Sequence, residues 1–167
     1  MGSKTDESSH VSEAQTTARM ARLLSPTALS DGPIAIGSMM EELVDGLGDP
    51  VRLQLRTIAN PLALGNRRAL QAALSGALWS ALGHSWPHGI VRVAVGQIGT
   101  GIFVEINSDA TIGDGARLRP ATDDDLGGEQ LTLAVADSVI KAHGGGLRVI
   151  EEDERLILIY LPLAAAA

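Results

Sequence analysis

A polar run in the second half of the chain has residue types that could bind a ligand. It covers residues 107–113, follows an alternating apolar segment, and reads Asn-Ser-Asp-Ala-Thr-Ile-Gly. Because side chains alternate along a strand, Asn107 and Asp109 point to the same side if the strand continues regularly. A carboxylate or amide oxygen at a strand end can accept hydrogen bonds from a bound molecule. In the alternative interpretation, these residues form an ordinary surface turn.

Two further polar residues lie one turn apart in the segment with the longest helical periodicity. The segment extends from residue 66 to about residue 84, and its apolar face is continuous: Leu70, Leu74, Ala77, Leu78, Ala81 and Leu82. Ser80 and His84 are four residues apart, so a helix presents them on the same face. They could act together on one ligand. Alternatively, Ser80 is a small residue at a helix–sheet contact and His84 is a polar residue at a helix end.

The helices that must position these side chains can be read from apolar periodicity. Three segments have the spacing of amphipathic helices, namely residues 39–47, 66–84 and 130–142. We expect Ser38 to N-cap the first helix, with Glu41 completing a capping box. The glycines after His143 end the last helix, because glycine adopts left-handed backbone geometry without steric cost.

The strands are read from alternating or continuous apolar runs bounded by turns. They are expected at residues 51–56, 90–95, 102–106, 147–150 and 156–163. Residues 58–64 are either loop or short strand, and residues 112–128 are expected to form a loop. The apolar face of each helix must be buried against another layer. The fold class is therefore an α/β (α+β) sandwich, with a mixed, mostly antiparallel sheet and helices on one face.

Composition narrows the class of protein. The chain has 167 residues and a formal net charge of −7, which suits one domain with a proper core and argues against a nucleic-acid surface. It has no cysteine, so it has no disulfide and no thiolate nucleophile. No stretch is long and apolar enough to span a bilayer and no signal peptide opens the chain. We therefore expect a cytoplasmic domain without membrane contact.

The chain divides into three parts. Residues 1–12 are polar and lack apolar periodicity, so we expect a disordered tail or an expression tag. Residues 13–32 are expected to form a short helix and a linker, because Ser25-Pro26 stops the helical pattern. Residues 33–164 form the folded domain.

The order of elements and one C-terminal stretch resemble the catalytic ATP-binding domain of sensor histidine kinases, a Bergerat-type fold of the GHKL ATPase class. The stretch reads LTLAVADSVIKAHGG and is followed by a strand hairpin ending in YLPL. The sequence from Gly65 to Leu70 is also similar to the family's entry to its long helix. The resemblance covers about residues 34–163. It implies ATP and Mg²⁺ as cofactors and phosphoryl transfer to a histidine as the reaction.

The resemblance assigns nucleotide-binding roles to the polar residues described above. Ser80 takes the place of the family's Mg²⁺-binding asparagine, with His84 on the same face, and a hydroxyl oxygen can still serve Mg²⁺. Either Asn107 or Asp109 takes the place of the aspartate that binds the adenine amino group. Asp109 is favoured, because it forms with Thr111 and Gly113 a motif one substitution away from the family's Asp-x-Gly-x-Gly.

The family's glycine-rich lid, which opens the last helix, is reduced in this chain. Gly127 and Gly128 are present, whereas Gln130 and Thr132 replace later glycines. Backbone amides at a helix N-terminus still attract phosphate whatever the side chains are. The two basic residues of the lid, Arg117 and Arg119, could also contact phosphate oxygens. Alternatively, they pair with the acidic residues at 123–125.

Three functions remain open at this stage. The first is the ATP-binding catalytic domain of an atypical two-component sensor histidine kinase, which positions MgATP for phosphoryl transfer. The phosphoacceptor histidine domain would then lie on another part of a longer chain or act in trans, and a response regulator would be the second partner. The second function is a degenerate pseudo-kinase or phosphotransferase-like docking domain that binds no ATP. The third is a serine kinase similar to anti-sigma factors. Surviving Asp109, Gly113 and the Gly127-Gly128 pair favour nucleotide binding.

Overall fold

The computed structural model describes residues 32–47, 53–85, 89–109, 123–151 and 154–165, with the backbone alone for 123–132. These residues contain three helices, α2 (Ile36–Leu47), α3 (Arg67–His84) and α4 (Asp123–Ala142). They also contain seven strands: β1 (Pro33–Ala35), β2 (Leu53–Thr57), β3 (Leu62–Leu64), β4 (Val91–Ile98), β5 (Gly101–Asp109), β6 (Gly146–Glu151) and β7 (Glu154–Pro162). The tail and short helix expected before residue 32 lie outside the described residues, as does the expected loop at 112–122.

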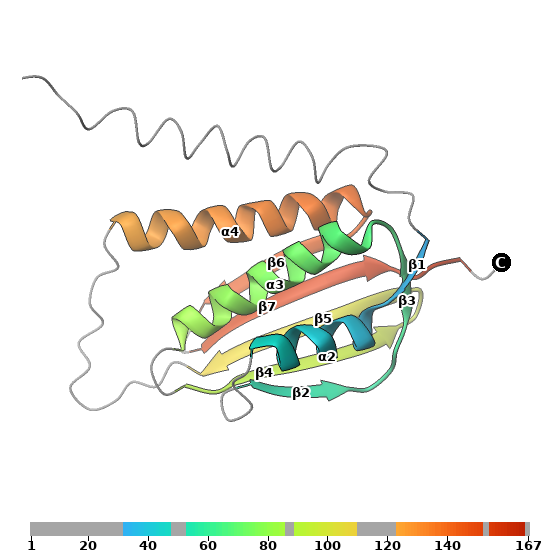
Figure 1. Cartoon of the computed structure of the whole chain (residues 1–167), viewed down its shortest axis with the longest axis horizontal. Coiled ribbons are helices and arrows are strands. Elements are labelled where there is room, and N and C mark those ends of the chain that lie inside the picture. The colour runs from blue at the N-terminus through green and yellow to red at the C-terminus, as the bar shows by residue number, and fades with distance from the viewer. Residues whose placement is uncertain (1–31, 48–52, 86–88, 110–122, 152–153, 166–167) are drawn as a thin grey trace, which may run out of the picture.

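The larger sheet is mixed and mostly antiparallel, as the sequence predicts. Its strand order is β2-β4-β5-β7-β6, with β2 parallel to β4 and every other neighbouring pair antiparallel. A second, two-stranded sheet pairs β1 with β3. Figure 1 shows all three helices on one face of the larger sheet. None of the helices in the described residues combines the length and apolar character needed to cross a membrane.

Side-chain alternation along β5 explains which face the helices cover. Ile102, Val104, Ile106 and Ser108 are buried, whereas the residues between them are partly exposed. The buried set joins the core that also contains Leu70, Leu74 and Leu78 of α3. None of the three helices in the described residues lies against the other face in Figure 1, and we call this the uncovered face.

The long helix α3 agrees closely with the sequence prediction. Asn66 is its N-cap, and the side-chain Oδ1 of Asn66 accepts a hydrogen bond from the backbone N–H of Ala69 at 2.8 Å. Leu74 and Leu78, in the middle of the apolar face, are fully buried. Helix α3 lies between α2 and α4 in Figure 1 and contributes most of the helical side of the core.

The start of α2 differs from the sequence prediction. The helix begins at Ile36, so Ser38 lies inside the first turn and is not the N-cap. The distant Asn60 takes that role: its Oδ1 accepts a hydrogen bond from the Ser38 backbone N–H at 3.1 Å. Asn60 Nδ2 also donates to Ser38 Oγ at 2.9 Å. Glu41 does not complete a capping box, because its carboxylate accepts a hydrogen bond from Thr57 Oγ1 at 3.1 Å.

Two segments that the sequence assigned to no helix or strand are regular in the structure. Helix α4 begins at Asp123, so residues 123–128, assigned to a loop from their glycines and acidic run, are helical. Residues 33–35, which the sequence assigned to no helix or strand, form β1, because their backbone groups pair with β3 and tie this segment to residues 62–64.

The end of α4 confirms the expected glycine stop. Gly144 has a φ of +78°, its N–H donates to Lys141 O at 2.9 Å, and the Gly145 N–H donates to Ile140 O at 3.0 Å. This pair of bonds is the Schellman motif. Next to it, the buried His143 uses both ring nitrogens: Nδ1 lies 2.7 Å from Val139 O, and Nε2 accepts from the Asn66 N–H at 3.2 Å. His143 therefore links the end of α4 to the start of α3.

Candidate functional site

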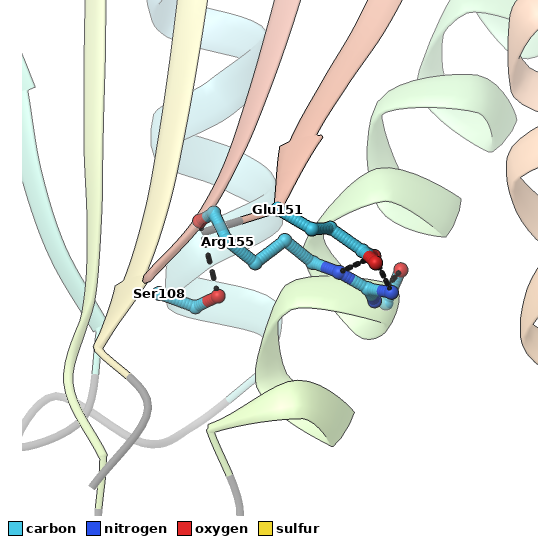
Figure 2. Close-up of polar contacts among 4 residues, drawn as sticks. Ser108, Glu151 and Arg155 are labelled. Carbon is cyan, nitrogen blue, oxygen red and sulfur yellow. Dashed lines mark hydrogen bonds and ion pairs between the residues drawn. The ribbon is translucent and has the colours of Figure 1, made fainter. Parts of the chain in front are cut away.

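Four polar residues meet at one end of the layer between α3 and the sheet, and we call them the Arg155 cluster. Ser80 comes from α3, Ser108 from the end of β5, and Glu151 and Arg155 from the β6–β7 hairpin. Ser80 and Ser108 are buried, with exposures of 4% and 0%. The Arg155 side chain is only 11% exposed, although it belongs to a charged hairpin. Figure 2 shows it extending from β7 toward α3 beside Glu151.

Arg155 makes the contacts that define this cluster. Its Nη1 donates a hydrogen bond to Ser80 Oγ at 3.1 Å, and its Nε donates to Glu151 Oε1 at 2.8 Å. Nη2 also pairs with the same carboxylate oxygen. The Arg155 backbone carbonyl accepts a hydrogen bond from Ser108 Oγ at 3.3 Å (Figure 2). Burial lowers the pKa of the guanidinium from its ordinary value, because the charged form is desolvated in this layer.

The register of the sheet places Arg155 in this layer. Arg155 lies opposite Ser108, and both belong to the same alternating set as the buried Ile106 and Ile157. The side chain of Arg155 must therefore leave the sheet on the side that the helices cover. There the end of α3 presents Ser80, whose hydroxyl accepts a hydrogen bond from the Arg155 guanidinium, a contact that periodicity did not predict.

His84 lies within the electrostatic range of the same cluster. Its pKa is lowered, first by burial and then by the positive charge of Arg155, while the Glu151 carboxylate acts in the opposite direction. The neutral imidazole is therefore favoured, because charging it would place a second cation near the guanidinium. This imidazole can donate or accept one hydrogen bond through each nitrogen.

Asn107 and Asp109 lie on the uncovered face. They share one side of β5, as alternation predicts, and this side is opposite to that of Ser108. Asp109 Oδ1 forms a 2.6 Å ion pair with Arg92 Nη1, and this hydrogen bond raises the pKa of Arg92. Asn107 Nδ2 donates to Glu154 Oε2 at 3.0 Å. Asn107 Oδ1 is buried without a hydrogen-bond partner among the described residues.

A shallow hollow also lies on the uncovered face, over β2, β4 and β5. Gln54, Arg56, Arg92, Ala94 and Glu105 line it, with Leu55 and Val93. Arg92 belongs both to this hollow and to the ion pair with Asp109. The hollow is therefore separated from the Arg155 cluster by the thickness of the sheet.

The similarity of this chain to known proteins lies in its structure. No protein-family model matches the chain, and no curated protein matches it by sequence. Full-length ShkA in complex with AMPPNP matches with a TM-score of 0.70 and 18% identity, over 93% of this chain and 36% of that one. A histidine kinase from Burkholderia phymatum matches with a TM-score of 0.67 and 20% identity, over 91% of this chain and 78% of that one. The catalytic domain of the histidine kinase ThkA matches with a TM-score of 0.62 and 14% identity, over 78% and 93%.

The chain has the fold of a histidine-kinase catalytic domain. At these identities the likeness establishes the fold and the arrangement of its elements. The resemblance inferred from the stretch LTLAVADSVIKAHGG and the element order is thereby confirmed, as is the sandwich with helices on one face of a mixed sheet.

The kinase-type fold implies MgATP, and the described residues do not fit it well. One nucleotide cannot contact Ser80 and also Asn107 or Asp109, because the sheet separates the Ser80 side chain from the other two. Within the described ranges, no group of three or more His, Cys, Asp or Glu residues is placed to hold a metal ion. The strand-end residue that faces α3 is Ser108, whose hydroxyl already bonds to the hairpin.

Ser108, Glu151 and Arg155 are the residues that sequence reasoning missed. The signal for Ser108 was present in the sequence, since Ile102, Val104 and Ile106 mark the inward face and Ser108 continues it. Arg155 had no comparable signal, because its contact with Ser80 joins residues 75 positions apart.

For the other residues assigned to a nucleotide site, the structure describes no side-chain position. Four of them lie outside the described residues: Thr111, Gly113, Arg117 and Arg119. Four more lie within α4 where only the backbone is described: Gly127, Gly128, Gln130 and Thr132. The glycine pair is thus part of a helix that has already begun, rather than the loop that was expected to open it.

Proposed function

We propose that this chain is a signalling domain of the histidine-kinase type that acts by docking to partner proteins and does not use ATP. The observation that carries the proposal is the placement of Asp109 and Asn107 on the face of β5 opposite to Ser80. The residues that the family resemblance assigns to adenine and to Mg²⁺ therefore do not line one cavity. Asp109 is instead held by Arg92, and Asn107 by Glu154.

The partners follow from the pathway in which such folds work. The first is a phosphoacceptor histidine domain, elsewhere on a longer chain or in trans, and the second is a response regulator. A domain that keeps a large apolar core and a stable sandwich can present a fixed surface to them without a catalytic site of its own. This role requires the fold and not the nucleotide.

The competing function is ATP-dependent phosphorylation of a histidine on another domain. One observation favours it: the likeness to ShkA, a protein solved with AMPPNP, extends over 93% of this chain. The backbone N-terminus of α4 would also attract phosphate groups. For a nucleotide to reach Ser80, however, Arg155 would have to leave that hydroxyl.

Calorimetric titration separates the two functions. The unmodified protein is titrated with ADP and with a non-hydrolysable ATP analogue, each with and without Mg²⁺. We expect no saturable heat up to about 1 mM nucleotide, where binding would still contribute roughly 4 kcal/mol. Saturable binding that requires Mg²⁺ would instead support the kinase function and overturn the docking proposal.

A further inference from the structure

We propose that the Arg155 side chain occupies the space between Ser80 and Ser108 and excludes a nucleotide from it. The inference rests on the proposed function and names the residue responsible for it. Its starting point is the unusual placement of a hairpin arginine, which is 11% exposed while its partner Glu151 is 57% exposed.

Arg155 bridges the two sides of the layer in which a ligand would have to lie. Its backbone carbonyl is held by Ser108 Oγ at the end of β5. Its guanidinium reaches the Ser80 hydroxyl on α3 at 3.1 Å. The length of the residue thus spans the distance between the strand end and the helix, so a ligand that contacts both serines would overlap with it.

The guanidinium opposes a bound nucleotide by its chemistry as well as by the space that it fills. Arginine has donors only and no acceptor, so it cannot receive the adenine amino hydrogen. Its charge is adjacent to Ser80 Oγ, and a divalent cation at the same oxygen would meet a like charge at close range. Glu151 fixes the guanidinium in this orientation through contacts to Nε and Nη2.

The experiment introduces a carboxylate acceptor at position 108, once with Arg155 present and once without it. Four forms are compared: the unmodified protein, Arg155→Ala, Ser108→Asp and the double variant Arg155→Ala/Ser108→Asp. With Arg155 present, a carboxylate at position 108 is expected to pair with the nearby guanidinium. Only the double variant should therefore gain binding of MgADP, by at least about tenfold in Kd over either single variant, the gain expected for a hydrogen bond to a charged acceptor.

Two controls keep the result interpretable. Arg148→Ala removes an exposed arginine from the neighbouring β6 and should leave binding unchanged. Arg155→Met keeps most of the volume without the charge, and Arg155→Met/Ser108→Asp should bind less well than the alanine double variant if the space itself is occupied. Thermal melts confirm that each variant is folded before it is titrated.

A second readout does not depend on nucleotide. The His84 imidazole is followed by NMR in the unmodified protein and in Arg155→Ala, where water and the loss of a cation should raise the pKa of His84. An unchanged His84 titration in a folded Arg155→Ala variant, or a folded double variant that binds no nucleotide, would overturn the inference and leave the docking function standing. Nucleotide binding by the unmodified protein would overturn the docking function itself.

Discussion

At the scale of single residues, His84 links the Arg155 cluster to stability. The pKa of His84 is lowered from 6.5, so below that pH the folded protein binds fewer protons at this residue than the unfolded chain. The contribution of His84 to the free energy of unfolding is complete above about pH 6.5 and is lost as the pH falls toward the pKa of His84 in the folded protein. Denaturant unfolding between about pH 5 and pH 8 should show that His84→Gln loses less stability on acidification than the unmodified protein. Equal acid sensitivity of the two proteins would contradict this assignment.

A second residue-scale prediction concerns the carboxylate that the sequence favoured for adenine. Asp109 is paired with the exposed Arg92 on the uncovered face, so Asp109→Ala should leave both the melting temperature and the calorimetric response to ADP nearly unchanged. Asn107→Ala is the matched variant on the same side of β5. A loss of nucleotide affinity confined to Asp109→Ala would restore the original assignment of Asp109 to adenine recognition.

At the scale of elements, the apolar face of α3 carries the helical layer. Leu74→Ala and Leu78→Ala should each destabilise the protein by roughly 2–5 kcal/mol, because both side chains are fully buried and leave a cavity. Arg68→Ala, on the exposed side of the same helix, is the control and should cost far less. Chemical denaturation measures all three, and similar losses at the three positions would mean that the buried face is misassigned.

The start of α2 offers a second element-scale test, because sequence and structure name different caps. Asn60→Ala should cost about 0.5–2 kcal/mol, the usual range for loss of an N-cap, since Asn60 Oδ1 bonds to the Ser38 N–H. Ser38→Ala should cost less, because its hydroxyl only accepts a bond from Asn60. The reverse order of losses in denaturant melts would return the cap to Ser38.

At the scale of the whole molecule, a ligand that binds the folded protein must raise its free energy of unfolding. A ligand at a hundredfold excess over its Kd stabilises the folded state by about 2.7 kcal/mol, whatever part of the fold it contacts. We expect no change in the melting temperature of the unmodified protein with millimolar MgADP. The Arg155→Ala/Ser108→Asp variant should instead melt at a higher temperature with MgADP than without it. A rise in the unmodified protein would mark it as a nucleotide-binding domain.

Much of the fold follows from local patterns in the sequence. The spacing of Leu70, Leu74 and Leu78 determines a buried helix face, because an α-helix repeats every 3.6 residues. The alternation in β5 determines that Asn107 and Asp109 share one side, because strand side chains repeat every two residues. Gly144 determines the end of α4, since its φ of +78° suits glycine. Each of these conclusions depends on neighbours along the chain.

Other features depend on segments that meet only in the folded protein. Which side of β5 the helices cover was decided by the packing of α3, and that packing separates Asp109 from Ser80. The cap of α2 comes from Asn60, 22 residues from Ser38, and β1 exists because β3 pairs with it. Arg155 reaches Ser80 because the β5–β7 register turns it inward. Contacts between distant segments are set by packing and strand register, which leave little trace in local periodicity. These contacts decided the chemistry of the Arg155 cluster.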